Sequence, residues 1–284
     1  MATVVSFINM KGGVGKTTLA SQIALAAGFG RHSRVLAIDL DPQSNLSQSL
    51  MGAQRYKQHL RENSPTVVQI FDGFRPPSGS RPGPRRVRVN ETILKKVCVR
   101  NPFSPDLIPS RLELTRNLKN GKGMERKLAE ALAQIEDQYD LIIIDCPPTE
   151  SVLTDAAYAA SRYVMVPVKP EFLGAIGLPL LASSMNDFRS RNPDHELDIC
   201  GIAINFFPNG KKFGPEARTS IAEIEEIAKE HRWSIYPARI PVSPTFARAT
   251  RAGTFIATTT SVKAPTPQKF HEFAKQFFAS IGMG

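Results

Sequence analysis

One glycine-rich stretch near the start of the chain constrains the fold more than any other feature: Met10-Lys11-Gly12-Gly13-Val14-Gly15-Lys16-Thr17-Thr18. An apolar, β-branched run at 3–8 precedes it and predicts a buried strand, while the run at 19–25 predicts a helix. A strand, a glycine loop and a helix in this order form a cradle for phosphate. The glycines let backbone N–H groups turn inward, and the helix N-terminus adds partial positive charge.

The polar side chains of this stretch suit a nucleotide. The Lys16 ammonium would reach the terminal phosphates, and the Thr17 hydroxyl would hold Mg²⁺. The general pattern G-x-x-x-x-G-K-[ST] is not fully met, because Met10 stands at the first glycine and a second lysine, Lys11, follows it. The backbone contacts to the nucleotide are expected from the loop residues Lys11, Gly12, Gly13, Val14, Gly15, Lys16, Thr17 and Thr18.

Acidic residues follow two further predicted strands. Asp39 and Asp41 come after the apolar run at 35–38, and Pro42 stops that strand from continuing. The apolar run at 141–144 ends in Asp145, which would reach Mg²⁺ directly or through water. Because ligands of open α/β sheets bind at the carboxyl ends of the strands, we expect these acids beside the glycine loop.

Three motifs together resemble the ParA/MinD/Soj family of deviant Walker A ATPases, and within it the ParA/Soj-type partition ATPases. They are K-G-G-x-G-K-T at 11–17, D-x-D-P-Q-x-N at 39–45 and the strand that ends in Asp145-Cys146-Pro147-Pro148. The resemblance implies that Asp41 orients the attacking water and that Asp39 belongs to the shell of Mg²⁺ or Lys16. It implies that Lys11 crosses to the nucleotide of a second subunit, so that ATP assembles a homodimer. It further implies slow hydrolysis of Mg²⁺–ATP that a partner protein accelerates.

The resemblance also indicates where the base would lie. Asn205, near the end of a predicted strand at 199–206, stands where such proteins often place an adenine contact, although a polar cap of the strand end explains it almost as well. A last predicted strand at 235–240 leads to Pro241 and Val242. In the family, the loop that begins there passes over the base.

The chain is strongly basic: 36 Lys and Arg against 26 Asp and Glu give a formal charge of +10. Such a balance favours a polyanionic partner, most simply DNA. Basic residues of the C-terminal third are the expected contacts, and each is equally explained as a solvated charge: Lys211, Lys212, Arg218, Arg239, Arg248 and Arg251. Val242 replaces the family's arginine after the proline, which moves the contact there to Arg248 or Arg251. Without a helix-turn-helix pattern, binding should not depend on DNA sequence.

Strands alternate with helical patterns along the chain, and the strands are apolar almost throughout. This predicts an α/β, P-loop NTPase-like fold with a mainly parallel twisted sheet and helices on both faces. We expect one domain over 1–284 that carries a basic Pro/Arg-rich insertion at about 73–90, which cannot form a helix or a central strand. The insertion could contact DNA or a partner, and a solvated linker explains it at least as well.

Three widely spaced cysteines, Cys98, Cys146 and Cys200, form no metal or disulfide pattern, which fits a reducing compartment. They also argue against a reductase like the nitrogenase iron protein, which needs paired cysteines to bridge a cluster. With no signal peptide and no apolar run near the length of a membrane span, we expect a cytoplasmic, nucleoid-associated protein.

Two functions remain open from the sequence. The first is a ParA-like ATPase that positions a plasmid, chromosome or protein cargo on DNA with a ParB-like or other adaptor protein. The alternative is a MinD-like membrane ATPase, which requires a basic amphipathic helix at the C-terminus. Phe270, Phe273, Phe277 and Ile281 form an aromatic stripe there, but the positive charge is modest, so we expect the stripe to pack on the core and membrane binding to be absent.

Overall fold

The computed structural model of the protein describes residues 1–71, 88–98, 104–117, 123–171, 174–208, 214–259 and 265–284. The predicted insertion at 73–90 lies outside the described residues except for its last three positions. The candidate DNA contacts Lys211 and Lys212 also lie outside them.

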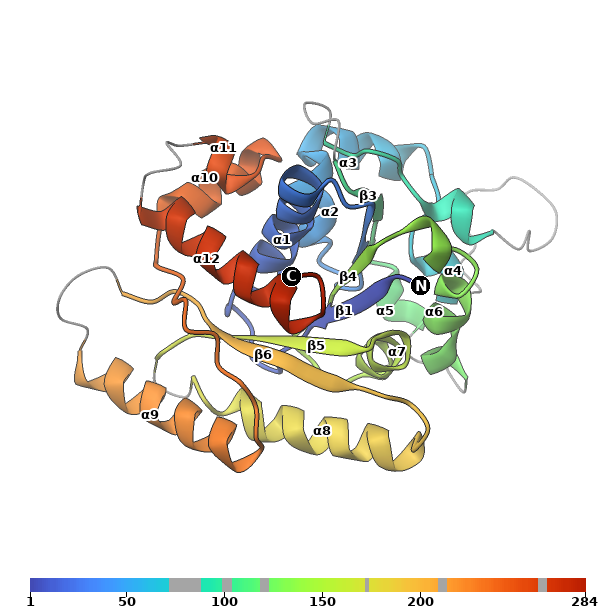
Figure 1. The fold of residues 1–284 in the computed structure, drawn as a ribbon. Helices are drawn as coiled ribbons and strands as arrows, with labels where there is room; N and C mark the ends of the chain where they lie inside the picture. The colour runs from blue at the N-terminus through green and yellow to red at the C-terminus, as the bar shows by residue number, and fades with distance from the viewer. Residues whose placement is uncertain (72–87, 99–103, 118–122, 172–173, 209–213, 260–264) are drawn as a thin grey trace.

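Within the described residues, a six-stranded sheet forms the centre of the molecule, with every strand parallel to its neighbours (Figure 1). The strand order is β3-β2-β4-β1-β5-β6. The strands are β1 (Thr3–Phe7), β2 (Val35–Asp39), β3 (Asp106–Ile108), β4 (Leu141–Asp145), β5 (Tyr163–Val168) and β6 (Asp198–Ile204). The predicted parallel α/β architecture is confirmed.

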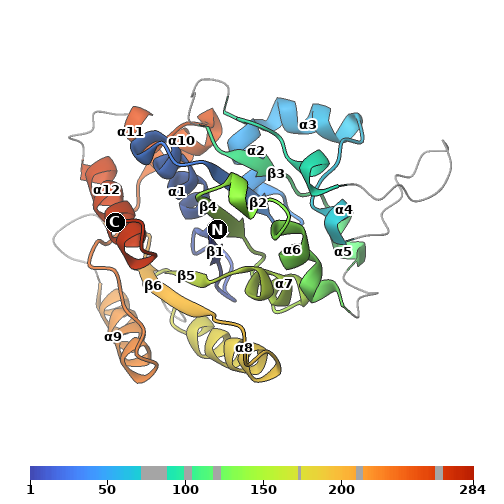
Figure 2. The same cartoon turned by 45° about the vertical axis from the view of Figure 1, so that its right-hand side comes forward.

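Helices cover both faces of this sheet (Figures 1 and 2). One face carries α1 (Lys16–Arg31), α2 (Asn45–Met51), α3 (Ala53–Arg61), α10 (Pro244–Ala252), α11 (Ile256–Thr259) and α12 (Pro265–Ser280). The other carries α4 (Val68–Phe71), α5 (Leu114–Asn117), α6 (Met124–Leu132), α7 (Val152–Ala160), α8 (Gly177–Arg191) and α9 (Pro215–Glu230). Short 3₁₀ turns lie at Val89–Thr92 and Glu136–Gln138.

The central strands are almost entirely apolar because both of their faces are buried. Successive side chains of a strand point to opposite faces. In β1, Val5 and Phe7 pack in the core under α1 and α12, while Val4 packs in the core under α7 and α8. A strand buried on both sides therefore needs apolar residues at nearly every position. The buried exception in β1 is Ser6, whose hydroxyl is hydrogen-bonded to that of Ser161 at 2.6 Å.

The aromatic stripe of α12 packs on the core, as predicted. Phe270, Phe273 and Phe277 are fully buried, and Ile281 is 4% exposed. The ring of Phe277 lies 5.9 Å from that of Phe7 in β1. No described helix is both long enough and apolar enough to cross a membrane.

The prediction of a regular strand at 235–240 is wrong. This segment runs beside β6 and joins it through isolated bridges, Ile202 with Ile235 and Phe207 with Pro241. The N–H groups of Tyr236 and Ile240 donate to the carbonyls of Ile202 and Ile204, both at 2.9 Å. Pro237 and Pro241 lack the N–H that a continuous ladder needs, so the pairing is interrupted.

Candidate nucleotide-binding site

Hydrogen bonds to residues of β5 and just after β6 hold the loop between β1 and α1 in place. Asn9 Nδ2 donates to the Pro167 carbonyl of β5 at 2.7 Å, and Asn9 Oδ1 accepts from the Lys11 N–H at 2.8 Å. Asn205, directly after β6, donates from Nδ2 to the Val14 carbonyl at 2.9 Å. These three hydrogen bonds fix the path of the loop before any ligand contributes.

Two glycines of the loop adopt backbone conformations that other residues rarely reach. Gly13 has φ of 74° and Gly15 has φ of 90°. At Gly15 space is also lacking, because a Cβ atom would collide with the Asn205 amide and would lie 3.2 Å from the Phe206 ring. Gly15 is therefore required both for its left-handed conformation and for the close approach of β6.

Lys16 lies at the base of the loop, 7% exposed. Its Nζ donates to the carbonyls of Asn9 and Lys11, both at 3.1 Å. Burial lowers the pKa of Lys16, while the carboxylates of Asp145 and Asp41 act in the opposite direction. A phosphate in the loop would offer this ammonium a charged acceptor in place of two neutral carbonyls.

Asp145 is a buried carboxylate that the described part of the chain leaves without a hydrogen bond. It ends β4 in register with Phe7 of β1, and neither of its oxygens accepts a hydrogen bond from a described residue. Burial raises the pKa of Asp145 well above its usual range, as does the neighbouring Asp39, while Thr17 and Lys16 offset part of this shift. Such a group is costly unless a ligand completes it.

Asp39 occupies the equivalent position on β2, in register with Asp145, but its oxygens are engaged. One accepts from the N–H and the hydroxyl of Ser47 in α2, at 2.8 and 2.6 Å. The other accepts from the Asp41 N–H at 3.1 Å. Burial raises the pKa of Asp39 to about 7. This carboxyl holds together the turn between β2 and α2, and its role as a magnesium ligand stays a prediction.

The fit of Mg²⁺ to this site follows from the unpartnered Asp145 carboxylate beside the Thr17 hydroxyl. Mg²⁺ prefers oxygen ligands, keeps several waters and binds through one or two protein groups together with substrate phosphates. The described residues contain no cluster of three or more His, Cys, Asp or Glu that would hold a metal ion. Asp145 and Thr17 therefore fit a magnesium ion that shares the phosphates of a nucleotide.

A cleft of about 730 Å³ lies over the loop. The loop residues that line it include Gly12, Lys16 and Thr17, and Asp41 and Gln43 line it from the turn after β2. The Gln43 N–H donates to Asp41 Oδ1 at 2.9 Å, which orients this carboxylate. The structure thus brings the predicted phosphate loop and the predicted water-orienting acid into one cleft.

The wall of the cleft differs from the predicted base site. Asn205, Pro241 and Val242 are not among the described residues that line it, and Pro241 is buried against Phe207. Phe206 lines the cleft instead, with φ of 54°, and the Lys169 ammonium lies 5.8 Å from its ring centre. The sequence could have indicated Phe206 as a cleft residue, because it is an aromatic residue directly after Asn205 at the end of a strand.

Comparison with known proteins identifies the family. A family model described as an AAA domain matches residues 2–199. The chain is also 32% identical over 257 residues to the chromosome-partitioning ATPase Soj of Thermus thermophilus, with 86% of this chain and 85% of the relative covered. The chain belongs to the ParA/MinD family.

Two solved structures share the fold of this ParA/MinD family member. The McdA–ATP complex from Cyanothece matches with a TM-score of 0.81 at 19% identity, covering 100% of this chain and 97% of that chain. The cobyrinic acid a,c-diamide synthase from Mycobacterium smegmatis, with a bound ATP analogue and magnesium, matches with a TM-score of 0.71 at 25% identity, covering 97% and 93%. Both proteins bind an adenine nucleotide or its analogue.

Lys11, the second lysine of the ParA/MinD loop, is held within its own chain. Its Nζ lies 3.0 Å from Glu171 Oε1, and the other oxygen of Glu171 pairs with Lys169. Hydrogen bonds from Lys169 and Lys11 lower the pKa of Glu171. The Lys11 side chain is 23% exposed, so it can leave this ion pair without breaking the core. Its contact with a second subunit stays a prediction.

The described DNA candidates lie on both sides of the sheet. Arg248 and Arg251 are exposed on α10, where Arg251 also lines the nucleotide cleft. Arg218 is exposed on α9, which covers the opposite face. Arg239 stacks on the Phe207 ring at 5.2 Å and pairs with Glu225 at 3.5 Å. The structure therefore gathers only Arg248 and Arg251 on one element, and all four roles stay predictions.

Proposed function

We propose that this chain is a ParA-type ATPase, which Mg²⁺–ATP assembles into a homodimer on DNA to position a cargo. One observation carries the proposal: the buried, unpartnered Asp145 carboxylate lies beside Thr17 and Lys16, and these two residues line one cleft together with Asp41. A phosphate group and its magnesium ion would satisfy all of these groups at once. The Soj relative from Thermus thermophilus, a chromosome-partitioning ATPase by name, supports the same activity.

Binding of the nucleotide rests on the loop. The N–H groups from Gly12 to Thr18 and the helix N-terminus of α1 would surround the phosphates, and the Lys16 ammonium would turn from the two carbonyls to the β- and γ-phosphates. Thr17 and Asp145 would hold Mg²⁺, which neutralises charge on these phosphates when bound. Phe206 offers a ring at the cleft wall on which the base can stack.

Hydrolysis needs a positioned water, and Asp41 is the residue placed for this role. Its carboxylate is 9% exposed, lines the cleft and is oriented by the Gln43 N–H. From there it would accept a hydrogen bond from the water that attacks the γ-phosphorus in line. The leaving diphosphate is stabilised by Lys16 and the loop, so the mechanism requires no general acid.

Dimer formation would link the nucleotide to DNA. Lys11 would exchange Glu171 for a phosphate of the second subunit, where the bond is charge-assisted and shielded from water. Two subunits double the number of DNA phosphate contacts, which raises affinity through counterion release and effective concentration. The exposed Arg248 and Arg251 of α10 are the proposed contacts, together with Arg218, Arg239, Lys211 and Lys212. We place the dimer on the nucleoid in the cytoplasm, with a ParB-like or other adaptor that accelerates hydrolysis.

The buried stripe of α12 argues against the MinD-like alternative. Membrane binding through this helix would need its apolar side chains to leave the core, and Phe270, Phe273 and Phe277 are fully buried there. Burying three phenylalanines contributes several kcal/mol to folding, on the order of 2–3 kcal/mol for each ring.

The decisive experiment measures ATP binding and co-sedimentation of the protein with DNA or with anionic liposomes, with and without Mg²⁺–ATP. Wild type should pellet with DNA only when ATP is present. Lys16→Ala should lose both ATP binding and DNA pelleting, whereas the control Lys229→Ala, an exposed lysine of α9, should keep both. Tight ATP binding by Lys16→Ala would contradict the loop assignment, and pelleting with liposomes alone would contradict the DNA assignment.

A further inference from the structure

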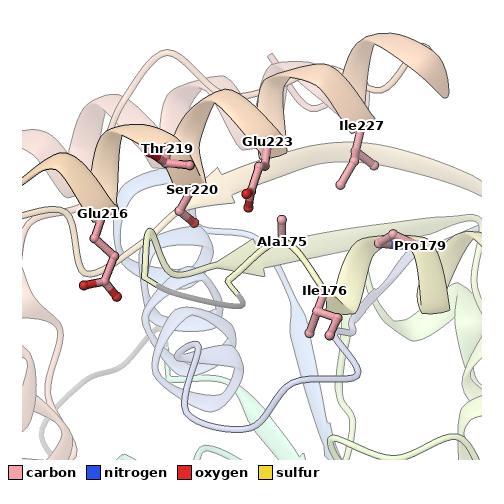
Figure 3. Close-up of a pocket in the computed structure, with 8 residues that line it drawn as sticks. All are labelled: Ala175, Ile176, Pro179, Glu216, Thr219, Ser220, Glu223 and Ile227. Atoms are coloured by element: carbon pink, nitrogen blue, oxygen red, sulfur yellow. The ribbon is translucent and has the colours of Figure 1, made fainter.

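A second hollow, of about 460 Å³, lies between the start of α8 and the length of α9 (Figure 3). It shares no lining residue with the nucleotide cleft. Ala175, Ile176 and Pro179 form one wall, and Ser220, Glu223 and Ile227 lie on the α9 wall. In Figure 3, the side chains of Ser220 and Glu223 point from α9 toward Ala175. We call this hollow the α8–α9 groove.

Apolar side chains are exposed along the α8–α9 groove. Ile176, which lines the groove, is 53% exposed. Leu180, one helical turn further and outside the groove lining, is 57% exposed. Ile227 belongs to the apolar stripe of α9 but is only half-buried, because it lines the groove. Exposed apolar residues that gather beside a concave surface mark interaction sites more often than isolated ones do.

A buried hydroxyl in the groove lacks a hydrogen-bond partner. Ser220 is 2% exposed, and its Oγ forms no hydrogen bond with any described residue. Buried polar groups are nearly always paired, so an unpaired one that lines a groove indicates where a ligand's polar group would bind.

The charge of α9 indicates the chemistry of the ligand. The helix carries five glutamates against Arg218 and Lys229, a formal charge of −3 in a chain whose total is +10. Glu223 is exposed over the groove, and none of the ion pairs among the described residues involves it. An unpaired carboxylate at this position over the groove attracts lysine and arginine.

We propose that the α8–α9 groove binds a short segment of a partner protein that carries apolar side chains flanked by lysine or arginine. The apolar side chains would cover Ile176 and Ile227, and a basic side chain would pair with Glu223. A backbone or side-chain group of the segment would bond to Ser220 Oγ. Charge complementarity with Glu223 favours this occupant over DNA at the groove.

The groove is in direct contact with the loop that holds Lys11. A Cβ atom on Gly177, the first residue of α8, would collide with Asn9 Oδ1 and lie 3.5 Å from the Lys11 nitrogen. Gly174 lies against Ser220 Oγ, which a Cβ atom there would approach to 2.9 Å. A segment bound in the groove would therefore contact Ala175 and Ile176, which lie between these two close approaches. Its effect on hydrolysis rests on the proposed function, whereas its binding does not.

The test uses a fluorescein-labelled helical peptide of leucine and lysine of about 14 residues, close to α9 in length. Fluorescence anisotropy should show that the leucine–lysine peptide binds to the wild-type protein. A matching peptide of leucine and glutamate should not bind. Glu223→Lys and Ile176→Asp should each weaken binding at least about tenfold. Glu225→Lys is the matched control, since Glu225 is on the same helix, pairs with Arg239 outside the groove and undergoes the same charge change.

Three results would overturn the proposal: no binding of the leucine–lysine peptide to wild type, an equal loss in Glu225→Lys, or unchanged binding in both groove variants. A change in self-association of Ile176→Asp, measured by sedimentation, without a change in peptide binding would assign the groove to a second copy instead. The Lys16→Ala variant should bind the peptide like wild type, so failure of the ATPase assignment and failure of the groove are separate outcomes. Ile176 and Glu223 are exposed, and Glu223→Gln provides a milder variant should Glu223→Lys unfold.

Discussion

Two aspartates lie side by side at the carboxyl ends of β2 and β4, and they differ in the hydrogen bonds that they accept. Asp39 and Asp145 are in register and both fully buried. Asp39 accepts three hydrogen bonds from the turn that follows it, whereas Asp145 accepts none from the described residues. The difference teaches that burial alone does not distinguish an acid whose hydrogen bonds the fold supplies from one that the fold leaves without them. The hydrogen-bond partners do.

The largest expected effect is on catalysis at Asp145. Asp145→Asn should reduce Mg²⁺-dependent ATP hydrolysis by at least about 100-fold, because the variant loses a charge beside the metal and the phosphates. The exposed acid Asp137 gives the control Asp137→Asn, which should keep wild-type turnover. Release of phosphate at saturating ATP measures both. Turnover of Asp145→Asn within about threefold of wild type would place the metal elsewhere.

The next effect is on folding at Asp39. Asp39→Asn should lower the free energy of unfolding by about 2–3 kcal/mol, because the amide cannot accept all the hydrogen bonds from Ser47 and Asp41 that the carboxylate accepts. Urea denaturation of the nucleotide-free protein measures the change. A variant as stable as wild type would mean that the turn after β2 does not depend on this carboxyl.

The same substitution at Asp145 should change the free energy of unfolding in the opposite direction. Asp145→Asn should raise the free energy of unfolding of the nucleotide-free protein by about 1 kcal/mol, because the cost of burying the Asp145 charge outweighs its attraction to Lys16 and Thr17. The urea midpoint should therefore rise at an unchanged slope. If Asp145→Asn destabilised the protein as Asp39→Asn should, the contrast between the two acids would be lost.

The smallest effect isolates the contact that engages Asp39. Ser47→Ala should lower the free energy of unfolding by about 1 kcal/mol, because it removes the hydroxyl that donates to Asp39 and accepts from the Ser110 N–H. ATP binding should stay within about twofold of wild type, a difference that converts to under 0.5 kcal/mol. A large loss of binding would instead indicate that Asp39 acts on the nucleotide through Ser47.

The sequence predicted the parallel sheet and the glycine loop between β1 and α1 because each depends on a local pattern. Apolar strands, a glycine loop and an acid at a strand end need no knowledge of distant residues. The walls of the cleft depend on which segments meet in space, so Phe206 was missed and Arg251 was assigned only to DNA. The prediction of a strand at 235–240 was wrong because it rested on the apolar residues of this segment. It did not take into account that Pro237 has no N–H to donate to a neighbouring strand.

The α8–α9 groove could not be predicted from the sequence, because it too depends on which segments meet in space. Ile227 repeats at helical spacing with Ile221 and Ile224, which predicts a core position, and only the placement of α8 leaves it half-exposed. The sequence also could not separate Asp39 from Asp145. Ser47, which engages Asp39, is eight residues away on a helix whose start the structure fixes.

The interrupted segment beside β6 has a consequence for how the molecule avoids aggregation. The edge strand β6 is covered along part of its length by residues 235–241, and at Pro237 this segment offers no N–H to a further strand. The other edge strand, β3, pairs through Leu107 with Leu94 in a single antiparallel bridge. Short, irregular covers of this kind satisfy the edge without extending the sheet. A chain of this build has sheet edges that resist uncontrolled growth into larger assemblies.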